Sequence, residues 1–583
     1  MQVIEEVKSE LIKVFEKLGY PTDVLSLTFS DRPELCDFQS NSAFSLAKVL
    51  KSAPIKIAEN IALNCPADKF KVEFCAPGFV NITLNNNYLA SLLKRFDEDG
   101  NLLVSKSKPK TIVLDYGGPN VAKPLHVGHL RSAILGETVK RIAKFMGDKV
   151  ISDVHLGDWG LQMGLTIAGL QNEFDLSYYF EGNGEKPNIT IEDLNRIYPE
   201  ASAKSKVDEE FKKYAQSITT KLQNKEKGYY DVWKDIRKIS VDAIKEEYKK
   251  LNVSFDLFNG ESDSQDYVPR VFEILNDKKL IEKSEGAEIV QVAKETDNAP
   301  MPPVIVRSSA GAGLYATTDI ATIIERVEKF NPDEIWYTTD NRQCMHFNQV
   351  FRVCELAKIG DNKVKFVHFP FGTVNGTDGK PFKTRDGGTM RLSELIKLVR
   401  DASNKKLEEN SGKKDEKLAE MIGVSALKFG DMINYRTKDY VLDIDKFCSF
   451  DGKTGPYLLY SLVRINSILQ KAGEFDKKYN INSEISKKII LSIIKLSAEI
   501  ENGYALQSAS GICQSAFNLA SDFSTLYASE KILTQPNEEK RKELLTLLSV
   551  VQKALTIVCH LLAIDIPEKM WLNDPFGSFF NLE

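Results

Sequence analysis

The sequence predicts a multidomain protein: an α+β domain at the N-terminus, a central domain with a parallel sheet and a helical insertion, and a C-terminal all-α bundle. Two observations carry this prediction. Near residue 115, a β-branched strand is followed by a turn rich in glycine and proline and then by an amphipathic helix. Hydrophobic stripes of helical spacing fill the last third of the chain. With 583 residues, the chain is long enough for three or four domains.

The central domain is predicted from one βαβ unit. Residues Thr111–Asp115 form a short apolar and β-branched run, typical of a buried parallel strand. A helix is expected over residues 130–146, with Gly147 where a terminating glycine would stand. Residues 149–154 complete the unit as a second strand. This order of elements predicts a nucleotide-binding fold of the Rossmann-like type.

The turn of this unit carries the candidate chemistry. It places His126, Gly128 and His129 at the start of a helix, beyond the carboxyl end of a strand. Free N–H groups and the helix dipole attract phosphate there, and the histidines can donate hydrogen bonds to phosphate oxygens. A plain turn with two surface histidines is the alternative, but two of only six histidines lie here.

A second glycine-rich segment suggests a different class of enzyme. Residues 311–316 fit the dinucleotide-binding fingerprint between a predicted strand and a predicted helix. An NAD-dependent oxidoreductase is therefore an alternative hypothesis. It does not account for the histidine turn, the lysine-rich segment near residue 380 or the helical last third.

Bulk composition narrows the location and the metal content. The apolar run at 554–564 is too short to span a bilayer, and the N-terminus reads as an amphipathic helix. We therefore expect a cytoplasmic protein with no membrane partner. The eight cysteines form no C-x-x-C pair, so we expect no structural zinc and no other metal site. Because the net charge is −5, a nucleic-acid partner would have to meet local basic surfaces.

Five sequence blocks resemble the motifs of one enzyme family. They are PNVAKPLHVGHLRS at 119–132, LGDWG at 156–160, LYATTDI at 314–320, GKPFKTRDGG at 379–388 and TGPYLLY at 454–460. In this order they resemble arginyl-tRNA synthetases, which are class I aminoacyl-tRNA synthetases. The resemblance implies an arginine-tRNA ligase that activates L-arginine with ATP and Mg²⁺ and transfers it to the 3′-terminal adenosine of tRNA(Arg), releasing AMP and pyrophosphate. It also implies a monomer.

The resemblance implies a domain division as well. The expected units are an N-terminal domain at 1–106 that binds the D-loop at the tRNA elbow, a catalytic domain at 107–385 with a connective insertion at 171–290, a helical region at 386–440 that contacts the tRNA stem, and a helical anticodon-binding domain at 441–583. The insertion is rich in Lys and Glu at helical spacings, so we interpret it as solvated helices. It is too short to hold an editing domain.

Phosphate chemistry is assigned by the resemblance to the histidine turn and to the loop at 380–385. The residues implied for ATP binding and catalysis are His126, Gly128, His129, Lys380, Phe382, Lys383 and Arg385. The loop departs from the usual class I pattern Lys-Met-Ser-Lys, because Thr384 stands where the second lysine falls. Which of its basic residues acts therefore stays open. The resemblance implies that Lys123 compensates; the alternative is an ordinary surface lysine.

An arginine pocket is expected from carboxylates, whose geometry suits a planar guanidinium. Asp115 ends the first strand, and Asp319 follows Tyr315 by four residues, so both reach one face of a helix start. The resemblance assigns these three to the arginine side chain, and Asn120 and Gln343 to its α-amino and carboxylate groups. Asp319 as an ordinary helix N-terminal carboxylate, another class I synthetase with a different pocket, and a non-catalytic tRNA-binding relative are the alternatives.

Contacts with tRNA are implied at both ends of the chain, at Phe79, Asn81, Tyr457, Tyr460, Tyr527 and Met570. Phe79 could stack on an unpaired base and Asn81 could read its edge, although Phe79 also fits a core strand position. Tyr457 and Tyr460 are three apart on one helix face and could stack on anticodon bases. Half-buried packing is the alternative for this pair. Residues 571–583 have no interpretation.

Overall fold

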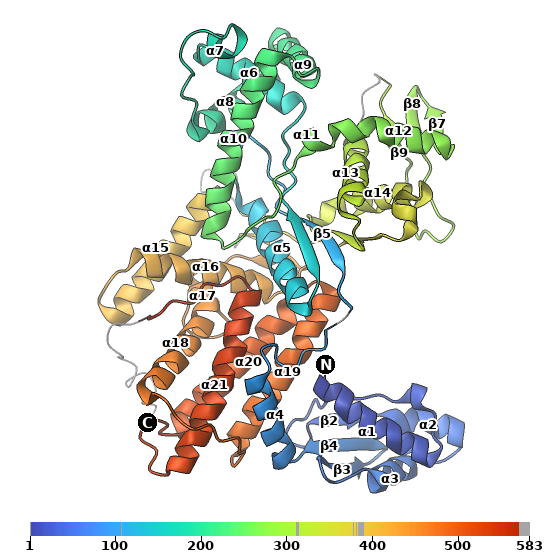
Figure 1. The fold of residues 1–583 in the computed structure, drawn as a ribbon, viewed down its shortest axis with the longest axis vertical. Coiled ribbons are helices and arrows are strands. Elements are labelled where there is room, and N and C mark those ends of the chain that lie inside the picture. The colour runs from blue at the N-terminus through green and yellow to red at the C-terminus, as the bar shows by residue number, and fades with distance from the viewer. Residues whose placement is uncertain are drawn as a thin grey trace.

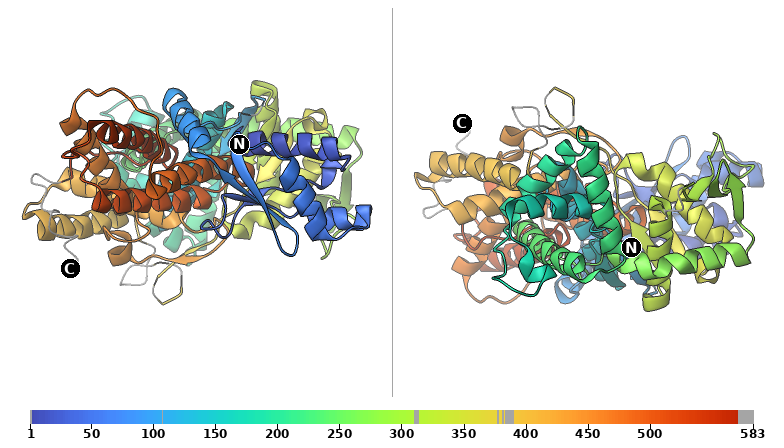
Figure 2. Two further views of the ribbon diagram at one scale, coloured as in Figure 1. Left: turned by 90° about the horizontal axis from the view of Figure 1, so that it is seen from below. Right: turned by 90° about the horizontal axis from the view of Figure 1, so that it is seen from above.

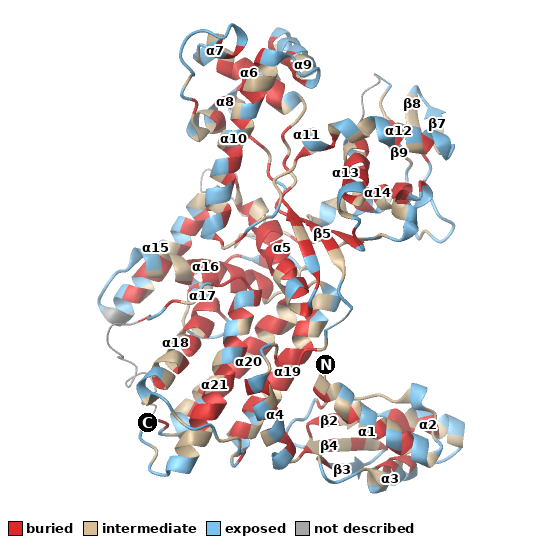
Figure 3. Ribbon diagram, in the orientation of Figure 1, coloured by how far each residue is buried: buried red, intermediate tan, exposed pale blue. Residues whose placement is uncertain are grey.

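The computed structural model describes residues 2–106, 108–309, 314–376, 378–380, 382 and 390–570. The molecule is elongated, with a central sheet below two lobes, a helical bundle beneath the sheet and an N-terminal domain beside the bundle (Figure 1). Buried residues concentrate on the central strands, on α5 and inside the bundle (Figure 3). The predicted fold class is confirmed.

Four parallel strands form the central sheet. Strand β5 (Thr111–Asp115) lies between β6 (Lys149–Asp153) and β10 (Glu334–Tyr337), and β11 (Lys365–His368) flanks β10. The strands expected at 111–115 and near 149–154 are thus confirmed. All four residues of β10 and four of the five in β5 are buried. Such burial requires cover on both faces of the sheet, which explains why neither strand alternates between apolar and polar residues.

Helices from three places in the chain provide this cover. Helix α5 (Val127–Met146) connects β5 to β6 and shares a hydrophobic core with Leu114. Helices α13 (Tyr315–Phe330) and α14 (Cys344–Leu356) share a second core with Val113. Because neighbouring side chains of a strand point to opposite faces, Val113 and Leu114 join different cores.

The chain leaves the sheet after β6 and builds two lobes, which are separate in Figure 1 and in the right-hand view of Figure 2. The first is the helical insertion, made of α6 (Leu161–Glu173), α7 (Ser177–Phe180), α8 (Ile191–Lys204), α9 (Glu209–Gln223) and α10 (Lys227–Lys250). The second holds α11 (Glu261–Ser264), η2 (Gln265–Tyr267), α12 (Val268–Asp277) and a three-stranded sheet of β7 (Ile281–Ser284), β8 (Ala287–Val290) and β9 (Val304–Arg307).

Strands β7 and β8 were not expected, because the sequence reads as helical from 171 to 290. Three of the four residues of β7 are exposed, so the strand has no apolar periodicity. Its conformation follows from antiparallel pairing with β8, which in turn pairs with β9. This pairing is a hairpin with a two-residue turn at Glu285 and Gly286, both with positive φ, and it overrides the weak local preference of β7.

The N-terminal domain combines helices with a small sheet. Its helices are α1 (Gln2–Leu18), α2 (Ser42–Leu50) and α3 (Pro54–Asn64), with the short turn η1 (Thr22–Val24). Its strands run in the order β1 (Thr28–Phe29), β2 (Phe38–Ser40), β4 (Phe79–Leu84) and β3 (Phe70–Cys75), all antiparallel. Strands β3 and β4 pair along their whole length.

The C-terminal third is a helical bundle, as expected. The bundle contains α15 (Leu392–Ser411), α16 (Glu416–Met432), α17 (Ile444–Phe447), α18 (Gly455–Ala472), α19 (Glu484–Leu506), α20 (Ser510–Ser529) and α21 (Glu538–Leu561). The short turns η3 (Asn341–Gln343) and η4 (Ile359–Asn362) lie before it in the chain, on either side of α14. The sequence of helix α20 is rich in serine. The helix forms because Ile512, Leu519 and Phe523 are buried in the bundle. A short strand, β13 (Tyr440–Val441), pairs with β12 (Val374–Asn375).

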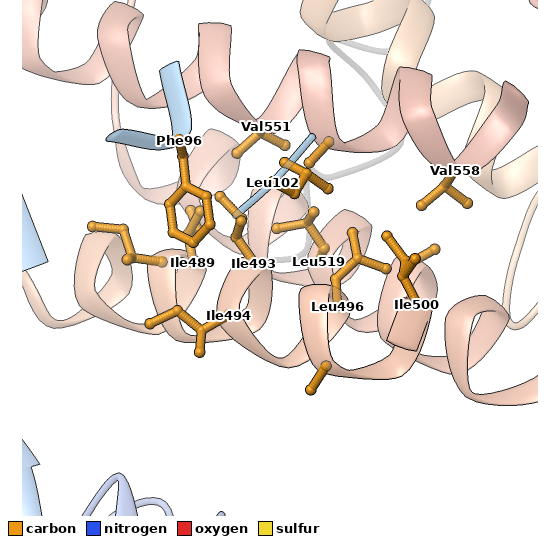
Figure 4. Packing of buried hydrophobic residues seen from close by; sticks show 14 of the residues in the cluster. Phe96, Leu102, Ile489, Ile493, Ile494, Leu496, Ile500, Leu519, Val551 and Val558 are labelled. Carbon is orange, nitrogen blue, oxygen red and sulfur yellow. The ribbon is translucent and has the colours of Figure 1, made fainter. Parts of the chain in front are cut away.

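Helix α4 (Asn86–Glu98) joins the N-terminal domain to the bundle. Phe96 from α4 and Leu102 just after it point among Ile489, Ile493 and Val551 of α19 and α21 (Figure 4). These residues belong to a hydrophobic core that also includes the interior of the N-terminal domain. The two domains therefore share one continuous core.

An ion cluster reinforces this junction. The Asp97 carboxylate accepts hydrogen bonds from Lys477 Nζ at 2.6 Å, Lys553 Nζ at 2.6 Å and the Tyr479 hydroxyl at 2.7 Å. Burial raises the pKa of Asp97, but the three hydrogen bonds outweigh burial and lower it to about 2. Asp97 thus stays ionised and ties α4 to the bundle.

Helix α21 is long and apolar enough to cross a membrane by length and composition. However, 67% of its most apolar window is buried inside the protein. It packs against α18, α20, α4 and α5. Its composition is therefore explained by its place at the centre of the bundle.

We expect Phe96→Ala to destabilise the junction between α4 and the bundle. Phe96 is fully buried, and deletion of such a ring costs about 3–5 kcal/mol in the free energy of unfolding. Urea unfolding followed by circular dichroism should show a lower midpoint. Phe74→Ala is the matched control, since Phe74 is 42% exposed on β3. Equal midpoints for the two variants would contradict the shared core.

Candidate active site

The site lies where the direction of the chain across the central sheet reverses. From β5 the chain passes through α5 to β6 on one side, whereas β10 pairs with the other side of β5. Crevices at such points, beyond the carboxyl ends of the strands, bind ligands in open α/β sheets. The Thr338 N–H donates to Asp115 O at 3.1 Å and holds the edge together. The loops after β5 and β10 border this crevice.

The two histidines form the start of α5. His126 is the N-cap residue, and its Nδ1 accepts the Gly128 N–H at 3.0 Å. The Nδ1 of His129 accepts the His126 N–H at 3.1 Å. The ring centroids are 3.9 Å apart. Because both Nδ1 atoms accept, each neutral ring carries its proton on Nε2. Neither Nε2–H has a hydrogen-bond partner among the residues that the structure describes, so both can donate to a ligand.

Both histidines are held in the neutral form. Burial lowers the pKa of His126, and the charge of Lys123 lowers it further. Burial lowers the pKa of His129 to about 3, with contributions from His126 and Lys123. The Lys123 ammonium therefore lies close enough to act on both rings. At neutral pH the site offers one ammonium and two uncharged imidazole donors.

Gly128 is required by the close approach of the His126 ring. A Cβ atom at this position would lie 2.8 Å from Cε1 and 2.9 Å from Nδ1 of His126. Gly128 is also exposed, which leaves this part of the helix start open to a ligand.

The loop expected to close over phosphates is partly described. Lys380 is exposed. The Phe382 N–H donates to Val374 O at 3.0 Å, and its ring packs against the central core. Lys383 and Arg385 lie outside the described residues, as do residues 311–313 of the glycine-rich segment.

The chain returns from this loop directly beside the histidine turn. The Val127 N–H donates to Met390 O at 3.0 Å, and the Leu392 N–H donates to Leu125 O at 2.9 Å. His126 and Arg391 form an antiparallel bridge. These bonds attach the end of the lysine-rich loop to the start of α5.

An acidic pocket lies at the start of α13. His346 Nε2 donates to Asp319 Oδ2 at 2.5 Å, and the Tyr315 ring lies 4.6 Å from the His346 ring. Burial raises the pKa of the Tyr315 hydroxyl, as do the charges of Asp319 and Glu261. These groups therefore face a common space.

Glu261 is a pocket residue that sequence reasoning missed. Burial raises its pKa to about 7, and the charges of Asp158 and Asp319 contribute, against the opposing effect of His155. It begins α11, far from every sequence block that suggested function. No local pattern marks it, because its role follows only from folding against α13.

Asp115, at the end of β5, pairs with an arginine of the chain itself. Its Oδ2 is 2.6 Å from Arg326 Nη2, which also contacts Asp153 Oδ2 at 2.8 Å. Burial raises the pKa of Asp115 although Arg326 opposes this. The carboxylate already has an arginine partner within the chain. The sequence could not predict this partner, which lies 211 residues away, and the arginine-binding role expected of Asp115 stays a prediction.

Asn120 and Gln343 border the crevice from the two loops. The Asn120 segment pairs with Gly157, and a Cβ at Gly157 would lie 2.1 Å from Asn120 Oδ1. Gly157 is thus needed to seat the Asn120 side chain. Gln343 ends η3, where its N–H donates to Asp340 O at 2.9 Å, and it is partly exposed.

Of the residues expected to contact RNA, three surround one cavity of about 590 Å³. Tyr460, Tyr527 and Met570 line it together with Arg464, whose guanidinium lies 4.6 Å from the Tyr460 ring and 4.7 Å from the Tyr527 ring. Tyr457 is not in this lining; its hydroxyl lies 3.0 Å from Ser524 Oγ. All residues that line the cavity belong to the C-terminal bundle, far along the chain from the strands of the central sheet.

The two N-terminal candidates lie together on β4. Phe79 is partly buried and makes an edge contact with Phe44, the ring centroids being 5.1 Å apart. Asn81 Oδ1 accepts a hydrogen bond from Gln39 Nε2 at 2.9 Å.

Comparison with known proteins assigns this architecture to a family. The family model described as tRNA synthetases class I (R), catalytic domain, matches residues 92–444, more than half of the chain. The chain belongs to the arginyl-tRNA synthetase family. The arginyl tRNA synthetase N terminal domain matches residues 1–84 of this family member, and the DALR anticodon binding domain matches residues 458–570.

Individual relatives agree with this assignment. The arginine–tRNA ligase of Agathobacter rectalis is 44% identical over 98% of this synthetase-family chain and 100% of its own. That of Alkaliphilus oremlandii is 43% identical over 97% and 100%. The arginyl-tRNA synthetase structures from Plasmodium falciparum and Thermus thermophilus share the fold, with TM-scores of 0.81 and 0.78 at 24% and 20% identity; each covers 97% of this chain and 99% of its own.

Within the described part of this family member, no group of three or more His, Cys, Asp or Glu side chains is arranged to hold a metal. All eight cysteines are free thiols. The expectation that no structural zinc is needed stays a prediction.

The pKa of His129 predicts how acid affects stability. The unfolded histidine titrates near 6.5 and the folded one at about 3, so the unfolded state binds the extra proton between these values. Stability therefore falls as the pH drops from about 6.5 toward 3. In His129→Asn, whose Oδ1 can still cap the helix, we expect this slope to shrink by up to about 1.4 kcal/mol per pH unit. Urea midpoints at pH 7, 6 and 5 would measure it, and parallel slopes would contradict the assignment.

Proposed function

We propose that the crevice beyond β5 and β10 activates L-arginine with ATP and that the activated arginine is then transferred to tRNA(Arg). The observation that carries this proposal is the pair of neutral histidines at the start of α5, which present two Nε2–H donors beside the Lys123 ammonium. As a member of its family, the chain is an arginine–tRNA ligase. The residue roles that follow are proposals.

In the first step, a carboxylate oxygen of arginine attacks the α-phosphorus of ATP, and the bond to pyrophosphate breaks. Charge moves onto the phosphate oxygens, so groups that meet this charge lower the barrier. His126 and His129 would donate from Nε2, and Lys123 would add a full positive charge. Exposed Gly128 lets the nucleotide approach the backbone. Lys380, Phe382, Lys383 and Arg385 are proposed to cover the outer phosphates.

ATP is expected to arrive as its Mg²⁺ complex, in which the metal neutralises part of the phosphate charge. The nucleotide would enter with its phosphates at the histidine turn, because that helix start is the anion-attracting end of the crevice. In the second step, a ribose hydroxyl of the 3′-terminal adenosine attacks the arginyl carbonyl, and AMP leaves. Neither step uses a covalent link to the protein.

The guanidinium of the substrate is proposed to bind between Asp319 and Glu261, against the Tyr315 ring. Two carboxylates suit its planar array of donors, and aromatic faces stack well on it. Asn120 and Gln343 would contact the α-amino and carboxylate groups. Lysine has a compact ammonium that cannot pair with both carboxylates at once, so one buried charge would be left without a partner. This explains selection of arginine without an editing step.

Two surfaces are proposed for tRNA. The cavity lined by Tyr460, Tyr527 and Met570 has aromatic faces for unpaired anticodon bases, each worth about 1–3 kcal/mol when stacked. Phe79 and Asn81 would contact the elbow. Tyr457 is proposed to support the first surface from α18. We further propose that the enzyme acts as a monomer in the cytoplasm.

The function is tested by ATP–pyrophosphate exchange with each of the twenty amino acids, with and without tRNA(Arg). We expect exchange with arginine alone among the amino acids. If exchange needs tRNA, the crevice is completed by tRNA binding; if it proceeds without tRNA, the crevice is complete in the free protein. Exchange with a different amino acid would contradict the proposed pocket, and none with any would contradict catalysis.

The arginine pocket is tested by Glu261→Gln and Asp319→Asn. Loss of one buried charge partner should raise the KM for arginine roughly 30-fold or more, with the KM for ATP little changed. In the unmodified enzyme, the KM for arginine should fall as the pH rises through about 7, because Glu261 then ionises. Glu261→Gln should lose this pH dependence.

The matched control for these two variants is Asp297→Asn. Asp297 pairs with Arg352 at 2.5 Å in the same lobe, outside the pocket. It should leave the KM for arginine unchanged. An equal rise in the three variants would mean that the lobe had been disturbed as a whole.

A further inference from the structure

The helical insertion holds the turn that precedes the histidines. Gln162 Nε2 from α6 donates to Val121 O, and the Ala122 N–H donates to Ser240 Oγ of α10 at 3.1 Å. Val121 is also fixed from the other side, since its N–H donates to Gly157 O at 3.0 Å. Helices α6 and α10 of the insertion thus each form a hydrogen bond with the two-residue segment Val121–Ala122.

These hydrogen bonds maintain an uncommon backbone conformation. Ala122 has a φ of 59°, in the left-handed region that residues with a Cβ seldom adopt. Such a conformation persists only where surrounding contacts determine it. The two hydrogen bonds from the insertion supply these contacts. They set the direction in which the next residue, Lys123, leaves the backbone.

The same insertion contacts the Lys123 side chain. Its Nζ lies 4.7 Å from the centroid of the Tyr198 ring of α8, a distance suited to a cation–π interaction. Tyr198 is partly buried and packs against the central core, so its ring is a fixed surface. The ammonium held there is three residues from His126 and lies close enough to act on both histidine rings.

We propose that Tyr198 is a positioning residue for catalysis, holding the Lys123 ammonium where it meets the phosphates of ATP. This rests on the role proposed above for Lys123. A lysine has a flexible four-carbon stem, so an ammonium ordered before the substrate binds needs less reorganisation in the transition state. The insertion is then part of the catalytic apparatus, although no atom of it forms or breaks a bond in the reaction.

The test is a double-mutant cycle on the rate of arginine-dependent ATP–pyrophosphate exchange. Tyr198→Leu keeps the apolar bulk and removes the aromatic face; we expect the rate constant to fall roughly 3- to 30-fold. The KM for arginine should stay unchanged. Tyr198→Phe keeps the face and should recover most of the rate. In a Lys123→Ala background, which is itself slow, Tyr198→Leu should cause no further loss.

Tyr229→Leu is the matched control. Tyr229 is a partly buried tyrosine of the same insertion, with the Lys221 Nζ 4.9 Å from its ring centroid. Tyr229→Leu should have the same Tm as Tyr198→Leu and should catalyse ATP–pyrophosphate exchange at the rate of the unmodified enzyme.

Each outcome separates the two proposals. If Lys123→Ala exchanges at the normal rate, the role of the lysine is wrong and the positioning role fails with it. If Lys123→Ala is slow but Tyr198→Leu costs the same factor with and without Lys123, only the positioning role is overturned. A loss in Tyr198→Phe equal to that in Tyr198→Leu would assign the effect to the hydroxyl and also overturn it. A faster Tyr198→Leu enzyme would mean that Tyr198 restrains the lysine.

Discussion

One buried guanidinium organises the carboxyl edge of the central sheet. Arg326 is 2% exposed and binds Asp115 of β5 and Asp153 of β6, with its guanidinium 5.3 Å from the ring of Tyr337 in β10. A buried charge without partners would cost several kcal/mol, so three adjacent strands and α13 must keep this arrangement together. Because α13 also carries Asp319, the floor of the crevice and the wall of the acidic pocket are fixed by the same side chain.

The histidine turn divides its two ring nitrogens between structure and chemistry. Nδ1 of each ring accepts a backbone N–H at the start of α5, and this leaves Nε2 as the donor. The same contact therefore sets the tautomer and the ring position, while burial and the charge of Lys123 keep the rings uncharged. A pair of ammonium groups here would repel each other and lose the cap, whereas imidazoles serve both purposes.

The fold could be predicted where the chain determines its own conformation. The strand at 111–115, the turn and the helix end at Gly147 depend on neighbouring residues, and all three are as expected. The sequence could not predict that Asp115 pairs with Arg326 or that Glu261 joins the pocket, because both facts depend on tertiary contacts. Helix α20 shows the same dependence, because its serine-rich segment has weak local preference and becomes helical through burial.

The continuous core between the N-terminal domain and the bundle sets the separation between the two surfaces proposed to bind tRNA. Phe96 and Asp97 anchor α4 in the bundle, so one continuous core connects β4 with the helices that line the cavity near Tyr460. If the proposed contacts are made, this core connects the surface that binds the elbow of the tRNA with the surface that binds its anticodon. When two binding surfaces are held at a fixed separation, the second contact costs little additional entropy once the first has formed. RNA molecules whose elbow and anticodon are separated by a different distance cannot make both contacts.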